Sequence, residues 1–330
     1  MKYAKDTRPK GVANKAAEVL VEALPWIKNI TGKTVVIKYG GSAMVDEQLR
    51  ADVMNDIVLL KIVGVNPVIV HGGGKAITEA MEFVNLPVEF KDGQRVTTPE
   101  AMDLVRTVLM GKVNQELVEA LNEHGNFAVG VSGADAGVIV AEQASPDLGR
   151  VGRITRINRP LLDDLVNADY IPVVASVALG EDGGFYNVNA DMVAGHIAAA
   201  IGAHKVVFLT DVDGLYENFE DKSTLISNLT LFEAQYLIEN DVVSTGMIPK
   251  LKSCVTALDA GVFRAHILNG TTPHSLLLEL LTSTGVGTTM HSTEEACKFD
   301  AHPLGNFASK LLENREQAAA QAAAAERFVG

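Results

Sequence analysis

The stretch that decides the fold is Thr34-Val-Val-Ile-Lys-Tyr-Gly-Gly-Ser-Ala-Met44. Val35 to Ile37 form a β-branched run of the kind that makes a buried strand. Lys38 ends this run, and Gly40 and Gly41 follow. Because glycine has no side chain, its backbone N–H group can approach an anion closely, and a lysine ammonium adds a positive charge. The stretch therefore predicts a strand that leads into a phosphate-binding turn.

A second stretch repeats this design, because the apolar residues Val68-Ile-Val70 precede His71-Gly-Gly-Gly-Lys75. Neither stretch has the Gly-x4-Gly-Lys-Ser/Thr spacing of a Walker A loop, and neither leads into the Gly-x-Gly-x-x-Gly of a dinucleotide site. One glycine pair alone indicates no more than a tight strand-to-helix turn. Two such turns, each with a nearby lysine, favour a site for phosphate chemistry.

The composition narrows the class of protein. A chain of 330 residues, 47% of them hydrophobic, is long enough for one large α/β domain or two lobes. The formal net charge of −13 disfavours nucleic-acid binding, and no apolar run reaches the roughly 18–20 residues of a membrane span. The charged N-terminus lacks a signal-peptide core, and two cysteines, Cys254 and Cys297, rule out a disulfide framework. We expect a cytoplasmic protein with no nucleic-acid or membrane partner.

Segments of strand and helix character alternate along most of the chain. The expected strands are 35–37, 67–70, 128–131, 171–175, 206–209, 265–268 and 288–290, and the expected helices are 47–63, 76–84, 99–124, 161–167, 192–201, 232–240 and 250–260. This alternation predicts an α/β fold with a mostly parallel central sheet sandwiched by helices. A change in character after Ala178 suggests two lobes that share one sheet, 31–178 and 179–292.

Two further segments flank this core. Residues 13–30 have apolar residues at helical spacing, and Pro25 is expected to kink or interrupt the helix. This N-terminal helix, within 1–30, either packs on its own domain or docks as an arm on another subunit. The Ala-rich tail, 293–330, favours helix by propensity but has little apolar surface to bury, so we expect a peripheral or disordered appendage.

Phosphoryl transfer needs cations around the migrating group and a positioned acceptor. Lys38 and Lys250 are the candidate cations. Lys250 is expected in the first turn of a helix, where a positive charge opposes the helix dipole, although a lone lysine there is more often a solvated surface residue. If the fold brings both lysines together, Asp191 could lie between them and limit their repulsion.

Other polar residues lie where ligands bind in open sheets. Asp211 and Asp213 follow a strand, at the position typical of nucleotide and Mg²⁺ sites, although acids are also ordinary in turns. Arg95 can make a bidentate contact with a carboxylate. Asn187 and Asn189, two residues apart on an extended segment, are expected to point to the same side.

Six motifs in order resemble those of the acetylglutamate kinases, a branch of the amino acid kinase family. They are Lys38-Tyr-Gly-Gly, His71-Gly-Gly-Gly-Lys75, Gly93-Gln-Arg95-Val-Thr, Tyr186-Asn-Val-Asn-Ala-Asp191, Thr210-Asp-Val-Asp-Gly-Leu-Tyr216 and Thr245-Gly-Met-Ile-Pro-Lys250. The resemblance runs from about Thr34 to Met290. It implies transfer of the γ-phosphoryl group of ATP to the γ-carboxylate of N-acetyl-L-glutamate, the second step of arginine synthesis.

The resemblance also implies residue roles. Lys38 and Lys250 would stabilise the transition state, and Asp191 would organise them. The substrate-binding residues would be Gly73, Gly74, Arg95, Asn187 and Asn189, in the lobe 31–178 or at its border. The ATP-binding residues would be Gly40, Gly41, Asp211, Val212, Asp213, Gly214, Leu215, Tyr216, Val242, Val243 and Ser244. Mg²⁺ would be held mainly by the ATP phosphates rather than by a protein metal site.

Two features resemble the arginine-inhibited members of the family. The N-terminal helix precedes the first strand, as in members whose dimers interlace into a hexamer, a trimer of dimers. The segment from His266 to Gly287 resembles their effector region, which implies contacts of L-arginine with His266, Glu279 and Gly285. In this resemblance the lobe 31–178 also forms the dimer, and the lobe 179–292 holds ATP and arginine.

The chain departs from the family pattern at Ser132-Gly-Ala-Asp135, where many members have lysine as the third residue. The nearest rivals are other members of the family, such as glutamate 5-kinase, aspartokinase, carbamate kinase or UMP kinase. Arg95 together with the asparagine pair favours the acetylated substrate. A catalytically silent arginine sensor is the alternative from another class, and the intact set of Lys38, Asp191 and Lys250 argues against it.

Overall fold

The computed structural model describes residues 10–41, 44, 46–91, 93–240, 242–244, 246–283 and 285–292, with residues 10–17 described by their backbone only. The predictions for the first nine residues and for the tail, 293–330, lie outside the described residues. Among the described residues, no helix is long and apolar enough to cross a membrane.

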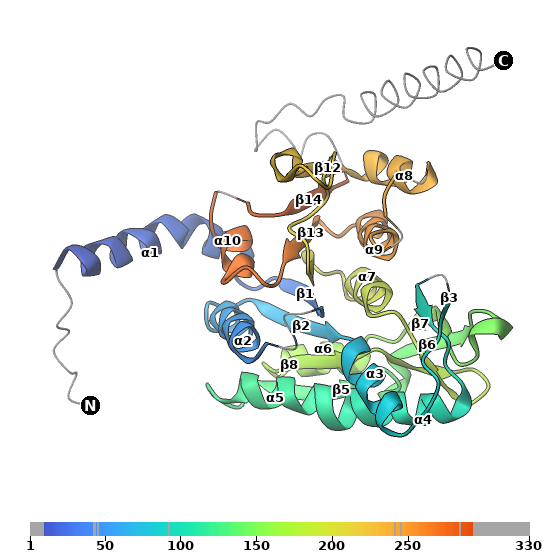
Figure 1. Ribbon diagram of the computed structural model, residues 1–330. Coiled ribbons are helices and arrows are strands. Elements are labelled where there is room, and N and C mark those ends of the chain that lie inside the picture. Colours follow the sequence, from blue (N-terminus) through green and yellow to red (C-terminus); the bar gives the residue numbers. More distant parts are fainter. Residues whose placement is uncertain are drawn as a thin grey trace, which may run out of the picture.

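An eight-stranded sheet forms the centre of the molecule (Figure 1), with the strand order β12-β14-β13-β11-β1-β2-β8-β5. Neighbouring strands are parallel except for the antiparallel pair β13 and β14. The strands are β1 (Thr34–Tyr39), β2 (Asn66–His71), β5 (Ala128–Ser132), β8 (Ile171–Ala175), β11 (Lys205–Thr210), β12 (Asn228–Thr230), β13 (Arg264–Asn269) and β14 (Thr288–His291). The predicted α/β fold with a mostly parallel central sheet is confirmed.

Helices cover both faces of this sheet because its central strands are apolar on both sides. Val35 and Ile37 of β1 belong to one hydrophobic cluster, and Val36 belongs to the other. The first cluster includes residues of the helices α2 (Glu47–Ile62), α3 (Gly74–Phe83), α4 (Pro99–Val108), α5 (Gln115–Asn122) and α10 (Ser275–Leu281). The second includes residues of α6 (Pro160–Asn167), α7 (Ala190–Ile201), α8 (Leu231–Glu239) and α9 (Ile248–Asp259).

A four-stranded sheet, in the order β10-β9-β6-β7, lies beside the main one. Its strands are β6 (Ile139–Gln143), β7 (Gly152–Ile157), β9 (Val177–Gly180) and β10 (Phe185–Asn187). Arg95 lies in the short hairpin of β3 (Phe90–Lys91) and β4 (Gln94–Arg95). The predicted lobe boundary at residue 178 falls inside β9, and the division into lobes stays a prediction.

The N-terminal helix α1 (Lys10–Ile30) leads into β1 and extends away from the sheet in Figure 1. The helix runs through Pro25 without a break, so the expected interruption there is wrong. Four of its apolar side chains are 57–67% exposed: Val19, Leu20, Val21 and Leu24. This apolar surface is compatible with the predicted docking on another subunit.

Several elements differ from the sequence prediction, among them β7 and β9, which the expected strands did not include. The helix expected over 99–124 contains a turn of π-helix, Leu109–Asn114, between α4 and α5. The helix α10 and the strand β12 were not expected, because seven mostly apolar residues show no helical period and a three-residue strand shows no alternation.

Candidate active site

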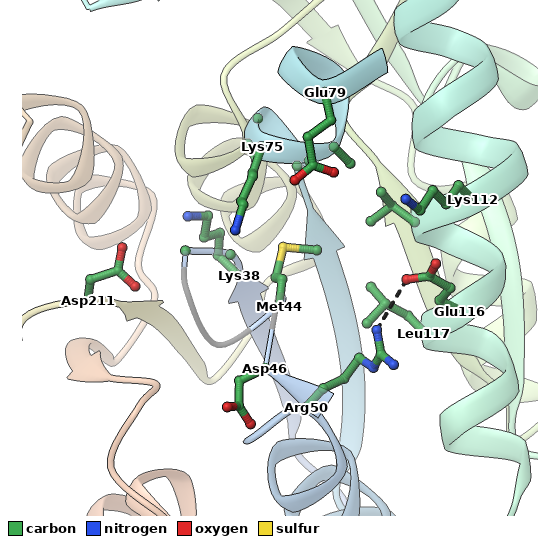
Figure 2. Close-up of a pocket in the computed structure, with 18 residues that line it drawn as sticks. Lys38, Met44, Asp46, Arg50, Lys75, Glu79, Lys112, Glu116, Leu117 and Asp211 are labelled. Carbon is green, nitrogen blue, oxygen red and sulfur yellow. Dashed lines mark hydrogen bonds and ion pairs between the residues drawn. The ribbon is translucent and has the colours of Figure 1, made fainter. Parts of the chain in front are cut away.

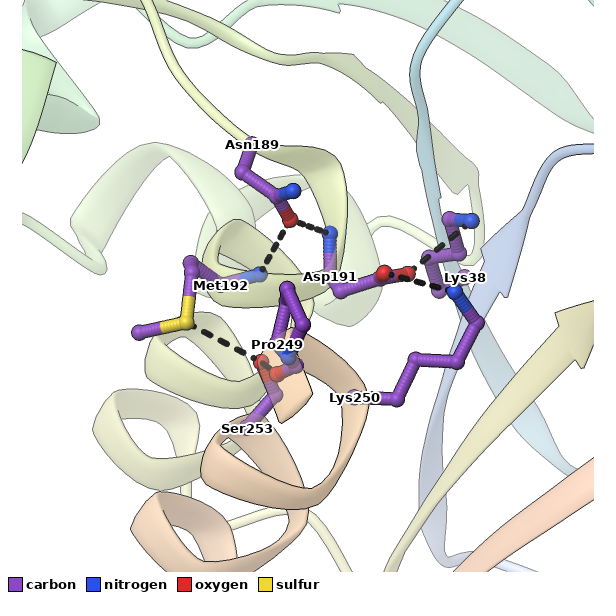
Figure 3. A network of polar contacts seen from close by, with 7 residues as sticks. All are labelled: Lys38, Asn189, Asp191, Met192, Pro249, Lys250 and Ser253. Carbon is purple, nitrogen blue, oxygen red and sulfur yellow. Dashed lines mark hydrogen bonds and ion pairs between the residues drawn. The ribbon is translucent and has the colours of Figure 1, made fainter. Parts of the chain in front are cut away.

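Three charged residues from three elements meet at the carboxyl end of β1 (Figure 3). Lys38 lies near the end of β1, Asp191 lies in the first turn of α7, and Lys250 is the third residue of α9. The ammonium of Lys38 lies 2.9 Å from Asp191 Oδ1, and that of Lys250 lies 3.1 Å from Asp191 Oδ2. The sequence expectation that this carboxylate lies between the two lysines thus agrees with the geometry.

Asp191 is buried, with 5% of its surface exposed. Burial acts to raise the pKa of its carboxyl group, but the charges and hydrogen bonds of Lys38 and Lys250 outweigh burial, so the pKa lies below its ordinary value. Asn189 fixes the start of α7, because its side-chain oxygen accepts from the N–H groups of Asp191 (2.9 Å) and Met192 (3.2 Å), as Figure 3 shows. Asn189, predicted as a substrate ligand, therefore acts here as the helix cap that orients the carboxylate.

A cavity of about 950 Å³ opens beside this cluster (Figure 2). It is lined by Lys38, Lys75 and glycines of both predicted loops, Gly40, Gly41, Gly72, Gly73 and Gly74. The two glycine stretches singled out in the sequence thus form one site, because they follow the paired strands β1 and β2. Figure 2 shows the ion pair of Arg50 and Glu116 (3.2 Å) at the other end of the cavity.

The first glycine loop contacts the predicted nucleotide segment. Gly41 has a φ of +79°, and a Cβ at this position would lie 2.4 Å from Asp211 Oδ1. Only glycine therefore suits both the backbone conformation and the space. Asp211 and Gly41 also line the same cavity, so the acid that follows β11 lies beside the loop that follows β1.

Arg95 and Asn187 are joined through a residue that the sequence reasoning missed. Thr97, which is fully buried, donates its hydroxyl to the Arg95 carbonyl (2.9 Å) and accepts from the Asn187 side-chain amide (3.3 Å). The Arg95 guanidinium donates to the Gly74 carbonyl (2.9 Å) and to Thr78 Oγ1 (2.6 Å). The structure thus ties Arg95 to the second glycine loop, although Arg95, Asn187 and Asn189 do not line the cavity itself.

The remaining predicted nucleotide residues fall into two groups. In the first, Asp213 accepts from the Tyr216 hydroxyl and from the Asn269 amide (2.9 Å), and these bonds hold its pKa below the ordinary range. Gly214 leaves room for Thr288, whose hydroxyl accepts from the Leu215 N–H at 2.8 Å. Val212 completes this turn after β11. The second group, Val242, Val243 and Ser244, lies between α8 and α9.

The three predicted effector residues lie together. Glu279 of α10 accepts from His266 Nδ1 of β13 (2.8 Å), from the Thr289 hydroxyl (2.7 Å) and from the Val286 N–H (2.8 Å). A Cβ on Gly285 would lie 3.1 Å from Glu279 Oε2. Burial acts to raise the pKa of Glu279, but these donors outweigh it and bring the pKa to about 2. Burial, with the charge of Lys205, lowers the pKa of His266 to about 4.

The sequence profile described as "Amino acid kinase family" matches residues 33–269, which span both glycine loops and Lys250. The chain belongs to the amino acid kinase family. This kinase is 50% identical over 274 residues to the acetylglutamate kinase of Caldanaerobacter subterraneus subsp. tengcongensis, covering 82% of this chain and 92% of the relative. It is 48% identical over 279 residues to that of Corynebacterium glutamicum, covering 82% and 87%. The predicted resemblance to acetylglutamate kinases is confirmed.

A solved structure also resembles this kinase. The N-acetylglutamate synthase of Neisseria gonorrhoeae, complexed with coenzyme A and N-acetyl-glutamate, superposes with a TM-score of 0.74 at 25% identity. The match covers 84% of this chain and 63% of the synthase. The fold of this solved structure agrees with the profile match. The family and the acetylglutamate kinase relatives show that the chain is an ATP-using kinase.

Proposed function

We propose that this kinase transfers the γ-phosphoryl group of ATP to the γ-carboxylate of N-acetyl-L-glutamate, giving N-acetyl-L-glutamyl 5-phosphate and ADP. The observation that carries the proposal is the pair of ammonium groups held by one buried carboxylate beside two glycine loops. Chains about half identical to this one carry the name acetylglutamate kinase, which supports the choice of substrate.

The acceptor needs no general base, because a carboxylate is already an anion at pH 7. Catalysis then depends on alignment and on neutralising the charge of the transferred group. Lys38 and Lys250 supply two positive charges to opposite sides of that group. Asp191 keeps the two ammonium groups near each other without leaving them to repel, and its low pKa keeps it ionised at neutral pH.

The acceptor's carboxylates would bind to Arg95 and Asn187. Three of the five N–H donors of Arg95 are used in the described contacts, with Gly74, Thr78 and Met81, so the Nε–H and one Nη1–H are left, and each would donate singly to a carboxylate oxygen. Because Arg95 also donates to the Gly74 carbonyl, binding of the acceptor would affect the position of the second glycine loop. Burial lowers the pKa of Arg95, but the guanidinium stays charged at any physiological pH.

The nucleotide would bind across the carboxyl ends of β1 and β11. Gly40 and Gly41 offer backbone donors to its phosphates, and the segment from Asp211 to Tyr216 lines its base and sugar. Among the described residues, no group of three or more acidic, histidine or cysteine side chains is placed to hold a metal. Mg²⁺ would be held mainly by the ATP phosphates, whose charge such an ion neutralises.

We also propose that L-arginine inhibits this kinase at His266, Glu279 and Gly285, and that the protein forms a hexamer of three dimers through α1 in the cytoplasm. The clustering of the three residues supports the effector site. An arginine guanidinium would compete with the donors that Glu279 now has, so its binding would reorganise the link between α10 and β14. The exposed apolar side of α1 supports the oligomer.

The test is an ADP-release assay with N-acetyl-L-glutamate and L-glutamate side by side, each with and without L-arginine. The proposal expects turnover of the acetylated substrate alone and suppression by arginine. Turnover of glutamate instead would point to another kinase of the family. Turnover that ignores arginine would remove the effector site, and no turnover together with arginine binding would indicate a sensor.

A further inference from the structure

The helix that follows Pro99 changes its geometry where it meets the second glycine loop. The π-turn Leu109–Asn114 accommodates one residue more than an α-helical turn, and such turns occur frequently at functional sites. A Cβ on Gly73 would lie 2.7 Å from the Leu109 side chain and 3.2 Å from that of Val113. The loop therefore rests directly on the π-turn, and the missing side chain of Gly73 leaves room for this approach.

Asn114, the last residue of the π-turn, makes a buried link to His71, the residue before the loop. Its amide nitrogen lies 2.9 Å from His71 Nε2 and 2.8 Å from the carbonyl oxygen of Val173. A carbonyl can only accept, so the Asn114 nitrogen must face Val173, and that nitrogen can only donate. His71 Nε2 is therefore the acceptor, and the ring proton lies on Nδ1.

The His71 ring, oriented by Asn114, in turn holds the loop through a hydrogen bond. Its Nδ1–H donates to the carbonyl oxygen of Gly72 at 2.9 Å. The ring is fully buried, and burial lowers its pKa to about 4, so it stays neutral at pH 7. The C=O of Gly72 and the N–H of Gly73 point to opposite sides of one planar peptide. Holding the carbonyl thus also fixes the direction of the Gly73 N–H.

The fold makes room for Asn114 at some cost. A Cβ on Gly130 of β5 would lie 2.0 Å from Asn114 Oδ1, so a glycine opposite leaves space for the amide. This oxygen is buried, and among the described residues it has no hydrogen-bond partner. A buried unsatisfied acceptor destabilises a fold, and an apolar side chain would avoid that penalty. The amide is therefore best explained by the donor that it provides to His71.

We propose that Asn114 and His71 are positioning residues for the reaction, which hold the Gly72–Gly73 peptide so that the Gly73 N–H donates to the anion bound in the cavity. The inference rests on the proposed phosphoryl transfer, because a fixed N–H direction affects turnover only if an anion is bound there. Neither residue needs to contact the substrate, since both act through the loop.

The first experiment compares Asn114→Leu with Asn122→Leu. Asn122 lies on α5 and bonds the backbone of Ala128 on β5 (2.8 and 3.2 Å), so it is a half-buried asparagine that also holds the backbone of a strand but has no described hydrogen bond to the loop. We expect Asn114→Leu to lower kcat about 10- to 100-fold with little change in the KM for ATP, as for a misplacement of about 1 Å. Asn122→Leu should shift Tm to a similar extent and keep kcat. Equal kcat values in the two variants would overturn the proposal.

A second pair of variants separates the two contacts of His71, in case Asn114→Leu does not fold. His71→Asn keeps a donor near the position of Nδ1, whereas His71→Gln places its amide near Nε2. The proposal expects His71→Asn to retain the higher kcat, because the bond to Gly72 is the one that fixes the loop. The reverse order would overturn it.

The tautomer of His71 gives a readout that does not depend on turnover. Long-range ¹H–¹⁵N NMR spectra of the wild-type protein should show a neutral ring protonated on Nδ1. A ring protonated on Nε2 would overturn the link to Asn114. Failure of the proposed function would appear separately, as no turnover of N-acetyl-L-glutamate by the wild type, and the tautomer would still decide whether the link exists.

Discussion

Replacing Lys250 with methionine tests the central cluster, because it removes one charge and keeps much of the side chain's length. The ammonium lies 3.1 Å from Asp191 Oδ2, and at an effective dielectric constant of about 20 this separation corresponds to a gross attraction of about 5 kcal/mol. Much of that attraction offsets the cost of burying the two charges, and Asp191 keeps Lys38 at 2.9 Å. The net loss of stability should therefore be near that of one charged hydrogen bond, about 1.5–3 kcal/mol.

The loss in rate should be larger than the loss in stability suggests. A positive charge that acts on the developing charge of the transition state is worth about 10²- to 10³-fold in kcat. We expect a fall of that size in Lys250→Met, with a KM for ATP close to that of the wild type. Lys252→Met is the control, because Lys252 is exposed on the same helix. A KM for ATP that rises while kcat stays unchanged would refute the reasoning, since it would mean that Lys250 binds ground state and transition state equally.

The pH dependence of the same variant gives a second measurement. Both lysines lower the pKa of Asp191, and burial raises it. With one cation removed, burial weighs more and the pKa rises, so Asp191 becomes protonated at a higher pH. The acidic limb of the kcat–pH profile should therefore move to higher pH in Lys250→Met, and an unmoved limb would mean that Asp191 does not act through its charge.

Four further outcomes are expected. Gly41→Ala should raise the KM for ATP roughly tenfold in initial-rate assays. The reason is that φ is +79° and a Cβ would meet Asp211, which causes a strain of about 1–3 kcal/mol. An unchanged KM would mean that this loop does not bind the nucleotide. Glu279→Gln should abolish inhibition by L-arginine while activity without arginine persists, and intact inhibition would remove Glu279 from the effector site. Tm should fall as the pH drops from about 6.5 to about 4, because folded His266, with its pKa of about 4, resists the proton that the unfolded chain accepts. This difference amounts to roughly 3 kcal/mol at most, and His266→Gln should make the fall in Tm smaller without abolishing it, because buried His71 also has a pKa of about 4. Leu24→Asp on α1, now 57% exposed, should lower the mass measured by light scattering, whereas an unchanged mass would mean that α1 is not the contact.

Much of the fold could be predicted because its strands are apolar on both faces and glycine turns mark where they end. β1, β2 and β8 were expected within one or two residues of their observed ends. The π-turn could not be foreseen, because a single extra residue in a helix leaves its composition unchanged. Pro25 predicts a kink or an interruption, and α1 continues through it without an interruption. Proline lacks the backbone N–H donor, and the 21-residue helix α1 tolerates this loss.

The site was predictable in its charges and less so in its hydrogen bonds. The sequence pointed to Lys38, Asp191 and Lys250. A lysine next to a glycine turn, or in the expected first turn of a helix, can be recognised from the residues beside it. It did not reveal that Asn189 caps α7 or that Thr97 joins Arg95 to Asn187. Such roles depend on which backbone group lies within about 3 Å, and that is set by tertiary packing. An asparagine two residues before an acid in a helix's first turn was a capping signal that could have been used.

The pairing of β1 with β11 has a consequence for how far this protein can be divided. These two strands lie in the middle of the sheet, with their apolar residues buried, and they come from opposite halves of the chain. A fragment that ended between them would expose a long apolar strand edge, which invites aggregation. Neither half should therefore fold alone, and heating should melt both in one transition. Chimaeras with relatives are best joined in surface loops, so that this central ladder stays from one parent.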